Sequence, residues 1–196
     1  VTIPFSATED EMRLYYLISA YMQRIDTYGV PLQQRHLIIL VARKLLASST
    51  AAIIRTLEGI ISRLRKLEKD EQEDASWVDN LITGDDLDEE WFAEAADEEG
   101  EYTTEEASID LEKLNAEIIE LEQYVTLAKS IKVDAKAEAL LTALEQGFAN
   151  MAKVGAERKA VIFTESRRTQ DYLLQFLESR GYLGKIVTFS GSNTTA

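Results

Sequence analysis

One stretch of the sequence, residues 159–191, limits the fold more than any other. An apolar segment at 160–163 is followed by a polar turn, an amphipathic helix that ends near Gly181, and a second apolar segment at 185–189. This order is typical of one β-α-β unit of a parallel sheet. Because parallel sheets are covered on both faces, two strands and one helix cannot form a stable domain alone. We therefore expect a fragment that contains the opening of a larger α/β lobe.

The upstream part of the chain has the periodicity of helices. A capping-box pattern of Thr8 and Glu11 opens a first helix, which is expected to end at Gly29. A second helix is expected at 31–47, and one of the serines at 48–49 is expected to cap a third.

The third helix and a helix that follows an acidic segment carry heptad-like seams, one on each side of that segment. The apolar residues of the two seams are Ile53, Leu57, Ile60, Leu64 and Leu67, then Leu111, Leu114, Ile118, Leu121, Val125 and Ala128. Seams of this kind pack helix against helix. One interpretation is an antiparallel hairpin that projects by roughly 30 to 40 Å; the other is ordinary bundle packing. A last helix is expected at 133–153, with Gly155 as its stop.

The negative charge of the chain is concentrated in one segment. The net charge is −14, but residues 70–112 hold nineteen Asp and Glu and no Lys or Arg. The remainder carries 21 basic and 16 acidic residues, a net charge of +5. The acidic segment is expected to be largely disordered. It is either a solvated linker with a few anchoring aromatic residues, or a segment that docks onto a basic partner or folds back onto a basic surface of this protein.

Composition excludes several classes of protein. The longest uninterrupted apolar run, at 37–42, is far short of the ~20 residues that cross a bilayer. The chain has no cysteine, and hence no disulfide framework or thiolate metal site. Its start has no basic-then-apolar order typical of a signal peptide. A cytoplasmic location is compatible with these observations.

No residue pattern points to catalysis within this chain. The sequence lacks a Gly-x-x-x-x-Gly-Lys-Ser/Thr phosphate loop and a strand ending in Asp-Glu. The single histidine, His36, is expected on a helix surface. The carboxylates at 85–90 lack the central glycine of an EF-hand loop. We therefore predict no catalytic residue and no metal site.

Three motifs nevertheless occur in an informative order. They are Leu45-Leu-Ala-Ser-Ser49 followed by Ala52 and Leu57, Asp134-Ala-Lys136 followed by a leucine-rich helix, and Phe163-Thr-Glu-Ser-Arg-Arg-Thr169 followed by Phe189-Ser-Gly191. Together they resemble superfamily-two helicases of the Swi/Snf type, including the bacterial RapA-like members. In that family similar motifs occur, in order, in the helices between the two motor lobes, the helix that leads into the second lobe, and the start of that lobe.

The resemblance implies a fold and an activity for the parent protein. The fold class is then mostly α: a helical bundle or hairpin with an acidic insert, followed by a β-α-β unit that begins a RecA-like parallel α/β lobe. The implied activity is ATP-driven translocation along double-stranded DNA. ATP and Mg²⁺ would bind chiefly to the first lobe, before Val1, and an arginine motif beyond Ala196 would complete the active site. This chain alone would have no cofactor.

The same resemblance implies contacts with the nucleic-acid backbone. The residues concerned are Thr164, Ser166, Arg167, Arg168, Ser190, Gly191 and Ser192. Hydroxyls and exposed amides contact phosphates without reading bases, so binding would be independent of sequence and sensitive to salt. The alternative is that Ser166 only caps the helix while both arginines are solvated. Asp134 is expected to cap its own helix, with Lys136 pointing to solvent or to the preceding lobe.

The expected organisation has four parts: interlobe helices at 1–69, an acidic insert at 70–110, a returning and a leading helix at 111–155, and the truncated lobe at 156–196. We hypothesise that the acidic insert competes with DNA or recruits a protein partner. An exposed sheet edge would also favour self-association. The competing interpretation of the whole chain is a non-enzymatic helical interaction module with an acidic arm, and a generic doubly wound domain is a third.

Overall fold

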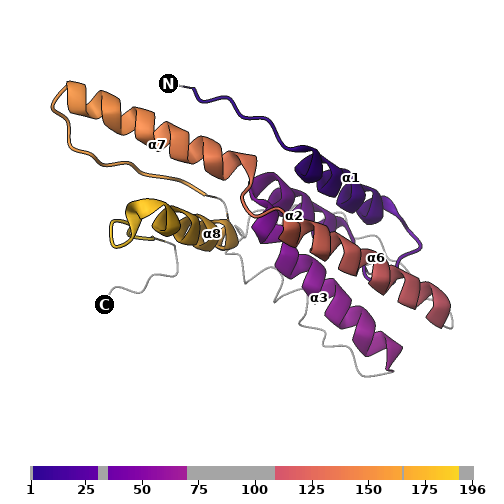
Figure 1. Ribbon diagram of the computed structural model, residues 1–196. Coiled ribbons are helices and arrows are strands. Elements are labelled where there is room, and N and C mark those ends of the chain that lie inside the picture. The colour runs from indigo at the N-terminus through magenta and orange to yellow at the C-terminus, as the bar shows by residue number, and fades with distance from the viewer. Residues whose placement is uncertain (1, 31–34, 70–108, 165, 190–196) are drawn as a thin grey trace.

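The computed structural model describes residues 2–30, 35–69, 109–164 and 166–189, and the regular secondary structure of these residues is helical (Figure 1). The elements are α1 (Glu9–Gln23), α2 (Arg35–Ser48), α3 (Thr50–Glu68), α6 (Leu111–Ser130), α7 (Ala135–Lys153), α8 (Arg167–Leu177) and the short π-helix η2 (Glu178–Tyr182). They form two groups, a bundle of α1, α2, α3 and α6 and a smaller unit of α7, α8 and η2 (Figure 1).

Helices α3 and α6 form the antiparallel hairpin that the heptad seams predicted. Arg65 of α3 pairs with Glu122 of α6, and Lys129 of α6 pairs with Glu58 of α3 at 2.6 Å, so the two helices run in opposite directions. Most seam residues are buried, although Leu111 is exposed. The hairpin does not stand free, because α1 packs along α6 and α2 packs along α3. The seams therefore form an antiparallel hairpin and also take part in bundle packing, because the hairpin is half of a four-helix bundle.

The start of α1 is as predicted and its end is not. Thr8 and Glu11 form the capping box, but α1 ends at Gln23 instead of reaching Gly29. A buried carboxylate explains the difference. Glu117 on α6 accepts hydrogen bonds from the Tyr21 hydroxyl at 2.7 Å and from the backbone N–H groups of Tyr28 and Gly29 at 2.8 Å each. These donors reach one carboxylate because the chain leaves the helix after Gln23.

Gly29 is needed at this point because the bundle leaves no space for a larger residue. A Cβ at position 29 would lie 2.6 Å from Cγ2 of Ile60 and 2.9 Å from Oε1 of Glu117, both well inside normal contact distances. The glycine therefore ends no helix. It lets the loop approach α3 and α6 closely.

The β-α-β prediction is wrong for the residues that the structure describes. Its helix is present as α8, and Gly181 follows with the positive φ of +94° typical of a helix stop. The flanking segments at 160–163 and 185–189 form no strand. Phe163 and Phe189 are 92% and 83% exposed. A parallel strand needs neighbours on its edges and cover on both faces, and these segments have neither here.

The second unit is small. Its buried apolar residues are Ala137 and Leu144 of α7 and Phe176 and Leu177 of α8. Helix α7 begins after Asp134, which caps it as predicted, and Gly155 follows its end with a φ of +70°. None of the described helices is long and apolar enough to cross a membrane.

Candidate nucleic-acid interface

The three motifs, which are far apart in sequence, meet where the bundle touches the second unit. The meeting point is the junction of α2 and α3, where Ser48 ends one helix and Ser49 caps the next by accepting from the Ala52 N–H at 3.2 Å. Helix α8 reaches this junction with its first turn. The Thr169 hydroxyl lies 2.6 Å from that of Ser48 and 3.1 Å from that of Ser49. A three-hydroxyl cluster thus joins the first motif to the third.

Arg168 strengthens the same contact. Its side chain is only 9% exposed and donates hydrogen bonds to the Thr56 hydroxyl at 2.9 Å and to the Ala52 carbonyl at 3.4 Å, both on α3. A guanidinium buried in this way is positioned by several fixed acceptors. The sequence suggested a phosphate contact or a solvated side chain for Arg168. The structure buries it between α3 and α8, so its side chain is not solvated.

The second motif, Asp134-Ala-Lys136, contacts both α2 and α8. Lys136 donates a hydrogen bond to the carbonyl of Ala47 near the end of α2, so it contacts a helix of this chain, whereas solvent or the preceding lobe was expected. The Asp134 N–H donates to the Tyr172 hydroxyl of α8 at 3.2 Å. Asp134 and Lys136 therefore tie α7 to the α2–α3 junction on one side and to α8 on the other.

Asp134 itself is a buried capping residue. It is 5% exposed, and its Oδ1 accepts from the Ala137 N–H at 2.8 Å. Burial raises the pKa of this carboxyl above its usual value of 3.8, the nearby Glu11 carboxylate raises it further, and the Ala137 hydrogen bond opposes both. The same physical cause, burial, raises the pKa of the Tyr172 hydroxyl to about 12. Asp134 and Tyr172 both belong to the contact between the start of α7 and α8, where the Asp134 N–H donates to the Tyr172 hydroxyl.

The predicted phosphate-contacting residues around the start of α8 differ in their exposure. Ser166 is 2% exposed and caps α8 by accepting from the Thr169 N–H at 3.4 Å. Thr164 is half-buried and donates to the Ser166 carbonyl at 3.1 Å, while Arg167 is exposed. Capping is therefore the observed role of the Ser166 side chain. The other three predicted contacts, Ser190, Gly191 and Ser192, lie outside the described residues.

A groove of about 730 Å³ runs along this joint. Its basic residues are Arg43 and Lys44 of α2 and Lys136 of α7, and its one acidic residue is the buried Asp134. Hydroxyl side chains from the first and third motifs complete the polar lining: Ser48, Ser49, Thr164 and Thr169. The sequence did not single out Arg43 or Lys44, because two cations within an amphipathic helix also fit an ordinary solvated face.

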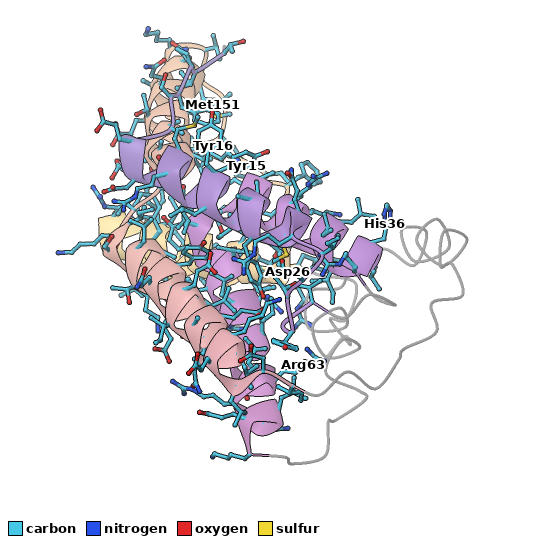
Figure 2. All side chains as sticks on the ribbon, turned by 90° about the vertical axis from the view of Figure 1, so that its right-hand side faces the viewer. Tyr15, Tyr16, Asp26, His36, Arg63 and Met151 are labelled. Atoms are coloured by element: carbon cyan, nitrogen blue, oxygen red, sulfur yellow. The ribbon has the colours of Figure 1, made fainter. Side chains whose placement is uncertain are left out.

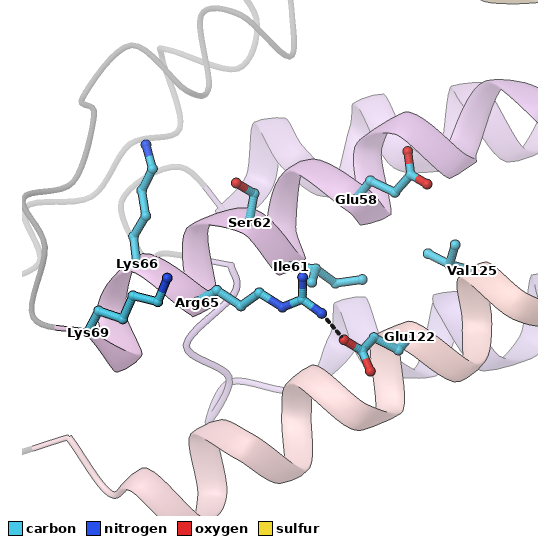
Figure 3. A pocket seen from close by; sticks show the side chains of 8 residues that line it. All are labelled: Glu58, Ile61, Ser62, Arg65, Lys66, Lys69, Glu122 and Val125. Atoms are coloured by element: carbon cyan, nitrogen blue, oxygen red, sulfur yellow. Dashed lines mark hydrogen bonds and ion pairs between the residues drawn. The ribbon is translucent and has the colours of Figure 1, made fainter.

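A second hollow of about 430 Å³ lies between α3 and α6 near the end of the hairpin (Figure 3). Arg65, Lys66 and Lys69 line it together with Glu58 and Glu122. The dashed line in Figure 3 marks the ion pair of Arg65 with Glu122, and Glu58 pairs with Lys129. Its charges are mixed and partly neutralised, which distinguishes it from the predominantly basic groove at the joint.

No group of three or more potential metal ligands gathers among the described residues. His36 is exposed on α2 as expected (Figure 2). The carboxylates at 85–90 lie outside the described residues.

Comparisons with protein-family models, with curated proteins and with solved structures found no match for this chain.

Proposed function

We propose that this chain is part of an ATP-dependent DNA translocase of the Swi/Snf type and contributes contacts to the nucleic-acid backbone. The observation that supports the proposal most is the convergence of the three motifs on one joint. Ser48 and Ser49, the Asp134 and Lys136 pair, and Thr169 come from three separate parts of the sequence, yet direct hydrogen bonds or adjacent contacts link them. A chance likeness of short motifs would not require them to meet.

The arrangement also fits the mechanical task of such a motor. A motor that steps along DNA needs backbone contacts that ignore sequence, and it needs those contacts to be held firmly by the rest of the protein. The first turn of α8 is fixed to α3 by Arg168 and to the α2–α3 junction by Thr169. Arg167 is the exposed cation of that turn. Force transmitted by the bundle would therefore reach the turn directly.

In this proposal the chain has no catalytic activity alone. ATP and Mg²⁺ would bind to other parts of the full-length protein, and the segments at 160–163 and 185–189 would pair with further strands of a RecA-like lobe. Double-stranded DNA is the proposed nucleic acid.

Measuring ATP hydrolysis by the full-length gene product, with and without duplex DNA, tests this proposal. We expect DNA to stimulate hydrolysis, and Arg167→Ala to lower the stimulation at subsaturating DNA. Lys153→Ala, which removes a lysine from the far end of α7, is the control. Full-length protein that hydrolyses no ATP under any condition would overturn the proposal and favour the non-enzymatic interaction module.

The acidic segment adds a regulatory hypothesis that rests on charge alone. Nineteen acidic residues at 70–112 accompany a remainder of net charge +5. We propose that these carboxylates compete with DNA for the basic surface. Replacing the Asp and Glu residues of 70–106 by Asn and Gln in the full-length protein should raise DNA affinity at low salt. Unchanged affinity would contradict the competition.

A further inference from the structure

We propose that Arg43 and Lys44 of α2, together with Lys136 of α7, form a second phosphate-contacting surface for DNA, beside the turn before α8. The inference rests on the proposed function and extends it to a helix that none of the three motifs marked for contact with DNA. The groove that carries it brings α2, α7 and the turn at 164 together.

The charge of the groove favours a polyanion. Three cationic side chains and one carboxylate, that of Asp134, line it. This carboxylate caps the N-terminus of α7, where its Oδ1 accepts from the Ala137 N–H, so the helix end offsets part of its charge. In the hollow between α3 and α6, by contrast, two glutamates accompany three cations.

The walls of the groove are held in place before any ligand arrives. The Ser48 and Thr169 hydroxyls link α2 to α8 at 2.6 Å, and Lys136 donates to the carbonyl of Ala47. Arg168 fixes α8 to α3 through its hydrogen bond to the Thr56 hydroxyl. Binding to walls that are already ordered loses less conformational entropy than binding to mobile ones.

The placement of the cations suits a phosphodiester chain better than a single anion. Arg43 and Lys44 are consecutive on a helix and therefore point in directions about 100° apart, while Lys136 comes from another element. Three charges spread in this way do not converge on one point. They suit successive phosphates along a strand, which lie several ångströms apart, and they offer no base-reading geometry.

Equilibrium binding of the full-length gene product to a duplex of mixed sequence, measured over a range of salt concentrations, tests this inference. The variant is Arg43→Gln with Lys44→Gln. Each lost phosphate contact lowers the slope of log K against log salt by about 0.9, so we expect the slope to fall by up to about 2 and the affinity to fall about 10- to 100-fold at low salt. The matched control is Arg65→Gln with Lys66→Gln, which removes an adjacent Arg–Lys pair from α3. This control should leave the slope unchanged.

The outcomes separate the inference from the proposed function. Wild-type protein that binds no duplex DNA at low salt would overturn both. Wild-type binding with equal slopes for the two double variants would overturn the inference alone. A fall in ATP affinity without DNA, at unchanged DNA affinity, would assign these cations to a nucleotide and would also overturn it. Unchanged circular dichroism melting of both variants shows that folding is not the cause.

Discussion

The helical bundle and the α7–α8 unit differ in how completely they bury their apolar residues. In the bundle all four helices contribute buried side chains, and even the polar Glu117 has three hydrogen-bond donors. The second unit buries few residues and exposes Phe163 and Phe189 beside a hollow of about 810 Å³. The bundle has a continuous buried core, although Tyr16 and Ile119 on its surface are exposed. The second unit has the apolar surface that further strands or another chain would cover.

The largest expected effect comes from the bundle core. Leu121 of α6 is fully buried, so Leu121→Ala should lower the free energy of unfolding by about 2–5 kcal/mol. Leu140→Ala in the half-buried face of α7 should cost less, and Leu183→Ala at an exposed position should change stability by no more than about 0.5 kcal/mol. Urea denaturation measures all three. Equal losses for Leu121→Ala and Leu140→Ala would contradict the difference between the two regions.

Glu117→Gln tests the polar centre of the bundle. The amide keeps one oxygen but turns an NH₂ group toward donors that are already in place, so we expect a loss of about 1–3 kcal/mol. Glu112→Gln, at an exposed position on the same helix, is the control. Amide exchange at Tyr28 and Gly29 should accelerate in Glu117→Gln only. Unchanged protection of these two amides would show that the carboxylate does not hold the loop.

The joint between the two regions should show energetic coupling. Ser48→Ala and Thr169→Val each remove one partner of the hydroxyl pair, and each should cost about 0.5–1.5 kcal/mol. Because the side chains are in contact, the double variant should lose less than the sum of the two single losses. Hydrogen exchange of α8 measures the effect. Strictly additive losses would mean that the contact does not join the regions.

A small pH effect should come from Asp134. Its pKa is raised in the folded protein, so folding favours the protonated carboxyl. The contribution is fully present below the unfolded pKa, near 3.8, and is lost as pH rises through the folded value. Asp134→Asn should therefore lose stability less steeply than the wild type between that pH and neutrality. Urea midpoints at successive pH values provide the test, and parallel curves for the two proteins would refute it.

Local sequence signals predicted the helices well and long-range contacts poorly. The capping residues Thr8, Ser49 and Asp134 and the spacing of the seams identified most helix starts and faces. Glu117 could not be found in this way, because an isolated glutamate on a helix is usually solvated and its partners lie 88 to 96 residues away. The apolar runs at 160–163 and 185–189 have the composition of strands, but strand pairing depends on neighbours that no local pattern supplies.

In the candidate site too, local features could be predicted from the sequence and long-range contacts could not. Capping by Ser166 was available as the alternative to a phosphate contact because capping is local. Arg168 was taken for a surface cation, and its burial against Thr56 depends on the packing of α8 on α3. Arg43 and Lys44 entered the site only when the structure placed α2 beside the turn before α8.

The most direct test of the backbone-contact account is the binding of full-length Arg167→Ala to several duplexes of unrelated sequence over a range of salt concentrations. Arg167 is the exposed cation in the first turn of α8. The account predicts a similar loss of affinity for every sequence and a salt slope lower by about 1. A loss confined to particular sequences, or an unchanged salt slope, would contradict it.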